Sequence, residues 1–178
     1  EDPITTDRKT RYSFFKEMDL MEFIHRALEI VADDATQKNE EENVIKVFSD
    51  KEEIKTKLTE LFYDRLDMNN ELWSAVYETC KMGDNFYEVI VDNYKNPKKV
   101  VYLRYLEPEK VERVEMNGRL LHFVYRTEIS PMVKNDPKIG FNIGKKEEIL
   151  YKLQPWQIIH FKIENKQRAP FGGSLLEA

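Results

Sequence analysis

The spacing of the apolar residues changes near Gly83, and this change limits the possible folds more than any other feature of the sequence. Before Gly83, apolar residues recur at steps of three and four, as they do along one face of an amphipathic helix. After it, they alternate with polar residues and are rich in Val, Ile, Tyr and Phe, which is typical of strands. Because helices and strands are segregated along the chain, we predict an α+β fold, with three N-terminal amphipathic helices followed by a mostly antiparallel β-sheet.

The helical half contains three predicted helices with distinct starts and ends. The first carries a long apolar stripe and runs into the acidic stretch DDATQKNEEEN. Ser49 and Glu52 have the spacing of a capping box, which marks the start of the second helix. The third ends at Gly83, since glycine readily takes the left-handed conformation at a helix C-terminus. The helices are expected over about residues 13–37, 50–66 and 70–82.

The second half contains six predicted strands and one clear hairpin. Asn117-Gly118 lies between two alternating runs, and this pair is the strongest short-range signal for a two-residue hairpin turn. The turn is expected to place Val114 opposite Leu121 on one face. The strands are predicted over about residues 85–92, 99–106, 111–116, 119–127, 148–153 and 158–163.

Residues 13–178 are expected to form a single domain, since the chain has no internal repeat and no linker long enough to divide it. Residues 1–12 are polar and are predicted to form an N-terminal arm. Residues 44–48 are apolar and are predicted to form an edge strand. Residues 129–148, with two prolines and two glycines, predict a long loop. The chain stops one turn into a further predicted helix, so we expect it to be a piece of a longer protein.

Composition excludes several classes of function. The net charge is −5, which disfavours a domain that holds DNA tightly through its phosphates. The sequence contains no apolar run of about 18 residues, so we expect no membrane partner, and its first residues lack the features of a signal peptide. The single cysteine, Cys80, excludes an intramolecular disulfide and suits a reducing compartment. These features indicate a cytosolic product.

The residue types that usually carry catalysis are scattered. His25, His122 and His160 have no second ligand at the spacing that metal sites use, and we expect them to be structural. Cys80 lies on the apolar side of the third predicted helix, where a buried and inert thiol is expected. The six glycines match neither the Walker pattern nor the dinucleotide fingerprint. We therefore expect no catalytic residue, no metal and no cofactor.

One pattern leaves an enzymatic alternative open. Glu164 and Lys166 follow the last predicted strand and resemble the Glu-x-Lys half of a metal-dependent nuclease site. Such a site uses carboxylates to hold Mg²⁺ and a lysine to orient the attacking water. It also needs an upstream aspartate on a neighbouring strand, and Asp92 is the plausible partner. Charged strand ends often give this pattern by chance, so a nuclease is an alternative here, as is a generic α+β protein-interaction module.

Three segments, in the same order, resemble the portal proteins of T4-like tailed bacteriophages. The stretch SFFKEMDLMEFIHRALEIVADDA resembles the opening helix of that family, with residues 31–35 at its Val-Asp-Glu-Ala-like signature. The stretch LWSAVYETCKMGDNFYEVIVDNYKNPKKVVYLRYLEPEKVERV resembles the helix, turn and strands that follow, with Gly83-Asp84 at the turn. The stretch QIIHFKIENKQRAPFGGSLLEA is similar to the strand, loop and Pro-Tyr-Gly-x-Ser-x-Leu-Glu run of the family. Here Phe171 replaces the usual Tyr, and Gly173 stands where a longer side chain is common.

The resemblance covers most of the chain, is weakest over residues 129–148, and implies the wing region of a portal subunit, cut before the stem, clip and crown. Portals are ring-shaped homo-oligomers, typically dodecamers, at one capsid vertex, and in this family the portal has no catalytic activity of its own. The implied partners are other copies of the chain, the major capsid and scaffolding proteins, terminase, tail or neck proteins, and double-stranded DNA that passes without sequence-specific binding. The implied location is the virion, after assembly in the host bacterial cytoplasm.

Charged residues make up 34% of the chain, which suggests that much of its surface faces water and partners. A head-to-tail interface closes into a ring when the rotation per subunit divides a full turn. We expect the charged faces of the second predicted helix at this interface, and the alternative is a solvated face. The expected interface residues are Glu52, Lys55, Lys57 and Glu60. The chain alone is expected to be a monomer or a weak associate.

Overall fold

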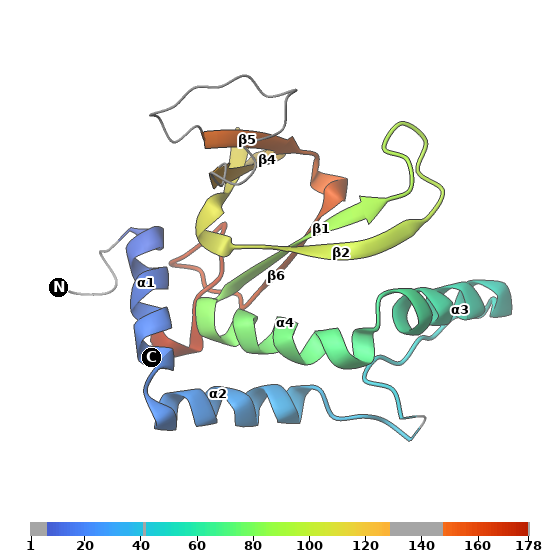
Figure 1. The fold of residues 1–178 in the computed structure, drawn as a ribbon, viewed down its shortest axis with the longest axis horizontal. Coiled ribbons are helices and arrows are strands. Elements are labelled where there is room, and N and C mark those ends of the chain that lie inside the picture. The colour runs from blue at the N-terminus through green and yellow to red at the C-terminus, as the bar shows by residue number, and fades with distance from the viewer. Residues whose placement is uncertain (1–6, 41, 129–147, 178) are drawn as a thin grey trace, which may run out of the picture.

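The computed structural model describes residues 7–40, 42–128 and 148–177, and Figure 1 shows helices on one side of two small sheets. The predicted α+β class is confirmed, with four α-helices instead of three. A π-helical segment, η1 (Glu60–Arg65), extends the third of them. The α-helices are α1 (Arg8–Asp19), α2 (Glu22–Ala35), α3 (Glu52–Thr59) and α4 (Met68–Met82). Among the described residues, no helix is long and apolar enough to cross a membrane.

The six strands form two three-stranded antiparallel sheets, in the orders β2-β1-β6 and β3-β4-β5, where one sheet was predicted. The chain passes between the sheets at two short 3₁₀ turns, each of which begins with a proline, Pro108 and Pro155. Proline suits the first position of such a turn because its φ angle is fixed and it lacks an N–H group. The strands are β1 (Asp84–Val91), β2 (Val100–Leu106), β3 (Val111–Met116), β4 (Arg119–Glu128), β5 (Glu148–Leu153) and β6 (Ile158–Lys162).

Two apolar layers hold the sheets to each other and α2 to α4. One lies between the sheets and consists of the buried side chains Phe86, Leu106, Val111, Phe123 and Leu153. The other lies between α2 and α4 and consists of Leu28, Ala32, Tyr77 and Cys80. Figure 1 shows α4 between α2 and the strands of the first sheet. Helix α4 is therefore the central element, since one of its sides packs on α2 and the other on β1.

The single helix predicted over residues 13–37 is wrong, because the structure breaks it at Leu20 and Met21. The apolar stripe continues through the break, so spacing alone gave no sign of it. The two parts pack on different partners: Tyr12 and Phe15 of α1 lie with Met82, whereas α2 packs along α4. A straight helix could not reach both partners, so tertiary packing overrides the local helical signal.

The N-terminal arm predicted over residues 1–12 also needs correction, because α1 begins at Arg8 and Tyr12 is buried. The Asp7 side chain caps this helix by accepting hydrogen bonds from the backbone N–H groups of Lys9 and Thr10. Such a cap satisfies helix donors that otherwise have no partner. Aspartate is a common capping residue, but Asp7 lies in a mostly polar stretch, where no helix was expected.

Three other local predictions are wrong. The Ser49 hydroxyl accepts from the Lys51 N–H and does not cap α3, which begins at Glu52 without a side-chain cap. Residues 44–48 form no strand. In the hairpin, Val114 pairs with His122, because an extra residue on β4 shifts the register before Glu115. The predicted loop lies almost wholly in residues 129–147, outside the described part of the chain.

Candidate functional site

The structure separates Asp92 from Glu164 and Lys166, the other two residues of the possible nuclease site. Strands β1 and β6 are antiparallel, and Asp84 pairs with Lys162, so Glu164 lies near the start of β1 and Asp92 lies beyond its end. Eight residues of strand separate these positions by about 26 Å. The Asp92 carboxylate instead accepts hydrogen bonds from the backbone N–H groups of Lys98 and Lys99, which lower its pKa. Over the described ranges, no group of three His, Cys, Asp or Glu residues could hold a metal ion.

Cys80 is buried, whereas the three histidines range from exposed His25 to well-packed His160. Cys80 belongs to the layer between α2 and α4, where burial raises the pKa of its thiol. His25 lies 3.0 Å from a carboxylate oxygen of Asp19 and 2.7 Å from the hydroxyl of Tyr77. His122 is half-buried on β4, and His160 contacts the buried carboxylate of Asp84. A thiolate nucleophile is disfavoured at a buried thiol of this kind.

Asp84 is the centre of a buried polar junction. Its side chain is almost fully buried, and its carboxylate accepts hydrogen bonds from the Tyr12 hydroxyl (2.8 Å) and the Gly172 N–H (2.8 Å). His160 Nε2 lies 2.6 Å from the same carboxylate. Arg113 Nη1 lies 3.4 Å from the other ring nitrogen of His160; since arginine can only donate, that nitrogen accepts and Nε2–H donates to Asp84. One carboxylate thus joins α1, β1, β6 and the Gly172 loop.

The same junction brings together two segments that the sequence placed far apart. Gly83 has a left-handed φ of +79°, and a methyl group at this position would lie 2.5 Å from the carbonyl carbon of Gly173. The Ser174 hydroxyl donates to the carbonyl of Lys81 (2.5 Å) in the last turn of α4. The Gly-Asp turn and the Pro-Phe-Gly-Gly-Ser run are therefore one packed unit. Each segment was noticed in the sequence, but no sequence signal indicated their contact.

Helix α3 and η1 form a projecting arm at one end of the long axis (Figure 1). No residue of α3 is buried, and all four residues predicted for the subunit interface have exposed side chains. Glu52, Lys55 and Glu60 line one shallow hollow, whereas Lys57 lies outside it and pairs with Glu53 (2.6 Å). An interface requires such exposure, and a solvated face shares it. The structure therefore brings three of the four residues to one stripe of the arm.

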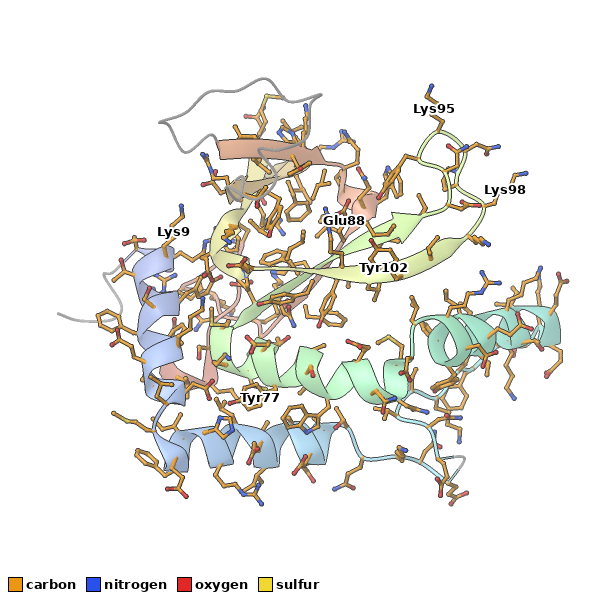
Figure 2. All side chains as sticks on the ribbon, viewed as in Figure 1. Lys9, Tyr77, Glu88, Lys95, Lys98 and Tyr102 are labelled. Atoms are coloured by element: carbon orange, nitrogen blue, oxygen red, sulfur yellow. The ribbon has the colours of Figure 1, made fainter. Side chains whose placement is uncertain are left out.

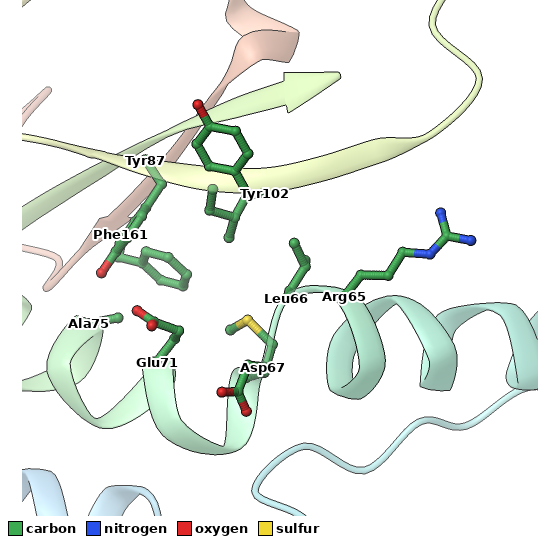
Figure 3. A pocket seen from close by; sticks show the side chains of 10 residues that line it. Arg65, Leu66, Asp67, Glu71, Ala75, Tyr87, Tyr102 and Phe161 are labelled. Atoms are coloured by element: carbon green, nitrogen blue, oxygen red, sulfur yellow. The ribbon is translucent and has the colours of Figure 1, made fainter. Parts of the chain in front are cut away.

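A cleft that the sequence did not predict opens where the arm joins α4 (Figure 3). It has a volume of about 240 Å³ and lies between this elbow and the sheet β2-β1-β6. Asp67 makes the sharp turn of the elbow with a left-handed φ of 47°, a conformation that aspartate tolerates better than most residues. Apolar lining comes from Leu66, Met68, Tyr102, Leu103 and Phe161, and charged side chains come from Arg65, Asp67 and Glu71.

Asp19 anchors the bend between α1 and α2. Its carboxylate accepts hydrogen bonds from the Tyr77 hydroxyl and from Lys81 Nζ (3.2 Å), and it lies beside His25. Figure 2 shows Tyr77 pointing from α4 toward α2. Burial raises the pKa of Asp19, but the hydrogen bonds from Tyr77, His25 and Lys81 outweigh burial and hold this pKa below its usual value. The bend is thus held by a carboxylate that must be ionised.

The Asp19→Asn variant is expected to lower the free energy of unfolding by about 1–2 kcal/mol at pH 7, since the hydrogen bonds remain only in part and the charge is lost. Because the folded pKa lies below the unfolded one, this stabilisation is complete above about pH 5 and disappears as the pH falls through the folded pKa. Urea unfolding at pH 7 and pH 3 measures both values. Asp50→Asn, at an exposed site, is the control. A difference between variant and parent that is the same at both pH values would contradict the account.

A sequence model of the family described as "Bacteriophage T4-like portal protein (Gp20)" matches residues 8–167, which is 160 of the 178 residues. The matched region contains the arm, the cleft, Asp19 and Asp84. It ends before the Pro-Phe-Gly-Gly-Ser run. A comparison with curated proteins finds no match.

Proposed function

Because this chain belongs to the family of bacteriophage T4-like portal proteins, we propose that it is a structural subunit of the portal ring at one capsid vertex. The observation that carries the proposal is the family match over residues 8–167. The fold supports it, since the chain presents a charged projecting arm and an adjoining cleft, both suited to contact with other proteins. In this role the protein acts through its shape and its contacts, without a catalytic centre or a cofactor.

We propose that DNA enters the capsid through this portal ring during packaging and leaves through it during ejection. Its proposed partners are the major capsid and scaffolding proteins during head assembly, terminase during packaging, and tail or neck proteins afterwards. We place this chain in the wing of the subunit. Its net charge of −5 supports passage of double-stranded DNA without tight binding, because tight binding requires basic side chains that neutralise phosphates.

The location of the protein in virions tests this function. Antibodies raised against this chain, coupled to gold particles, are to be applied to particles of the phage that encodes it, after opening the heads to expose internal surfaces. We expect label at a single vertex, at the junction of head and tail. Label spread over all capsid vertices, or along the tail, would contradict the proposed role.

Ring formation is proposed to involve the arm residues Glu52, Lys55, Lys57 and Glu60. In the protein that carries this chain, the Lys55→Glu/Lys57→Glu double variant is expected to reduce the fraction of subunits in rings several-fold. The reason is that the charge change is repeated at each subunit contact. Lys95→Glu/Lys98→Glu is the matched control: it changes the net charge equally, at the outward tip of the β1–β2 hairpin (Figure 2).

Mass photometry at matched concentration and salt measures the ring fraction of both double variants. Because exposed charge pairs are screened by salt, we expect the defect of the arm variant to depend on ionic strength. Equal ring fractions for the arm variant and the hairpin variant would show that these arm residues do not contribute to the interface.

A further inference from the structure

Large apolar side chains are exposed at the corner where α1 meets α2. We call this the apolar corner, and it consists of Phe14, Leu20, Met21 and Phe23. Leu20 is 85% exposed and Phe23 is 73% exposed. Single exposed apolar residues are normal, but several at one corner are typical of an interaction surface. The corner therefore needs a partner that covers it.

The apolar corner is held rigidly from inside. Asp19 immediately precedes Leu20 and is bound by Tyr77 and Lys81 of α4. Leu28 fixes the next turns of α2 in the layer against α4. A side chain that is already fixed in its bound position loses little entropy on association. Leu20 and Phe23 are thus presented as anchors, not as a loose surface loop.

The cleft at the elbow offers a complementary shape. The junction of α1 and α2 and the arm lie toward opposite ends of the long axis (Figure 1). The cleft is lined by residues 65–67, where the arm joins α4. A dry cavity of about 150 Å³ is enough to bind benzene, so a cleft of 240 Å³ has room for the ring of Phe23. Leu66 and Phe161 supply apolar walls for that ring (Figure 3).

The charges around the two surfaces also match. Glu22 flanks the apolar corner, as do Lys16 and Arg26, which pair with Glu109 (2.5 Å) and Glu29 (2.7 Å) within the same chain. The cleft presents one cation, Arg65, and two carboxylates, Asp67 and Glu71. Contact of Glu22 with Arg65 would pair opposite charges at the rim. Such complementarity favours one orientation of docking over others.

The geometry points to insertion of the apolar corner of one subunit into the cleft of its neighbour, with Phe23 and Leu20 as the anchors. The occupant of the cleft is then a second copy of this chain. Because the two surfaces are different and lie toward opposite ends of the subunit, the contact is head-to-tail and can repeat around a closed ring. This inference rests on the proposed portal function and assigns the surfaces that make the ring.

Cysteine cross-linking tests the contact in assembled rings of the protein that carries this chain. The double variant Phe23→Cys/Leu103→Cys places one thiol on each surface, while the buried Cys80 stays in all samples. Mild oxidation is expected to give a ladder of covalent multimers on a denaturing gel, because each subunit carries one thiol for each of its two neighbours. Each single variant should give no ladder, and a mixture of the two single variants should stop at dimers. Phe23→Cys/Tyr151→Cys, with the second thiol on β5, is the negative control.

Each outcome of the cross-linking decides between the inference and the proposed function. Rings that give a ladder of covalent multimers support both the inferred contact and the proposed portal function. Rings without a ladder overturn the inference and leave the portal function in place. A cross-link within one subunit also overturns the inference, since the corner would then be covered by its own chain. If no rings form at any concentration, the proposed function itself fails.

A second variant pair tests the anchor without added thiols. Leu20→Ser is expected to reduce the ring fraction about tenfold, as truncation of an interface anchor does, and to leave the thermal unfolding of the isolated chain unchanged. Leu150→Ser is the matched control, because Leu150 is also exposed but lies on β5. Equal ring fractions for the two serine variants would overturn the assignment of Leu20 as an anchor.

Discussion

Asp84→Ala is expected to lower the free energy of unfolding by about 3–5 kcal/mol, one of the two largest effects of a single substitution in this protein. The substitution leaves three buried donors without an acceptor: the Tyr12 hydroxyl, the Gly172 N–H and His160 Nε2–H. No water replaces the carboxylate easily, because the junction is almost fully buried. Urea unfolding monitored by circular dichroism measures the loss.

Two further variants sharpen the Asp84 experiment. Asp84→Asn keeps one oxygen, which can still accept from His160 Nε2–H and the Gly172 N–H, and replaces the oxygen that faces the Tyr12 hydroxyl with an amide donor. Its loss should therefore be large but smaller than that of Asp84→Ala. Asp50→Ala removes an exposed carboxylate and should change stability by no more than about 0.5 kcal/mol. A loss below about 1 kcal/mol for Asp84→Ala would show that the junction contributes little to the fold.

Gly83→Ala is expected to cost about 3 kcal/mol or more. The left-handed φ of +79° costs an alanine about 1–2 kcal/mol, and the added methyl group would lie 2.5 Å from Gly173 and 2.6 Å from Ser174. Both contacts are to backbone atoms, which cannot move aside as a flexible side chain can. Overpacking of this kind adds about 1–3 kcal/mol. The Pro-Phe-Gly-Gly-Ser run would have to separate from the end of α4.

Gly118→Ala is the matched control for Gly83→Ala. Gly118 has nearly the same φ, +73°, but no heavy atom of the described residues lies within 4 Å of an added methyl group. Its loss should therefore be limited to the same backbone effect, about 1–2 kcal/mol. The difference between the two variants measures the packing of the loop on α4. Equal losses at Gly83 and Gly118 would mean that the close backbone contact does not stabilise the protein.

The Asp84 junction also bears on the proposed ring contact. Tyr12 ties α1 to this junction, and α1 ends at the apolar corner. A weakened junction would therefore loosen the element that presents Leu20 and Phe23 to the neighbouring subunit. Asp84→Asn, measured at a temperature where it remains folded, is accordingly expected to reduce ring formation as well as stability.

Strands were the part of the fold that the sequence predicted best. The observed strands begin within one residue of the expected positions, because alternation of apolar and polar residues is a strong local signal. The division into two sheets was not predictable in the same way. It depends on where Pro108 and Pro155 redirect the chain, and each proline also fits a simple turn within one sheet.

The helical half shows the limit of periodicity. The apolar stripe runs through Leu20 and Met21 although the helix stops there. What breaks it is the need of α1 and α2 to reach different partners, which only the tertiary structure specifies. The cleft was hidden for the same reason, since its walls come from η1, α4, β1, β2 and β6. The exposed charges of α3 could be listed from the sequence, but their side of the arm could not be assigned.

If this chain forms part of a portal ring, electron microscopy of the assembled protein will show the ring itself. The protein that carries the chain is to be purified, examined by negative-stain electron microscopy and sorted into class averages for a count of subunits. We expect closed rings around an open channel, as head-to-tail contacts with closed symmetry produce, and about twelve copies per ring, as the resemblance to portal proteins implies. Dispersed single particles, even in samples held at high protein concentration before dilution onto the grid, would contradict this expectation.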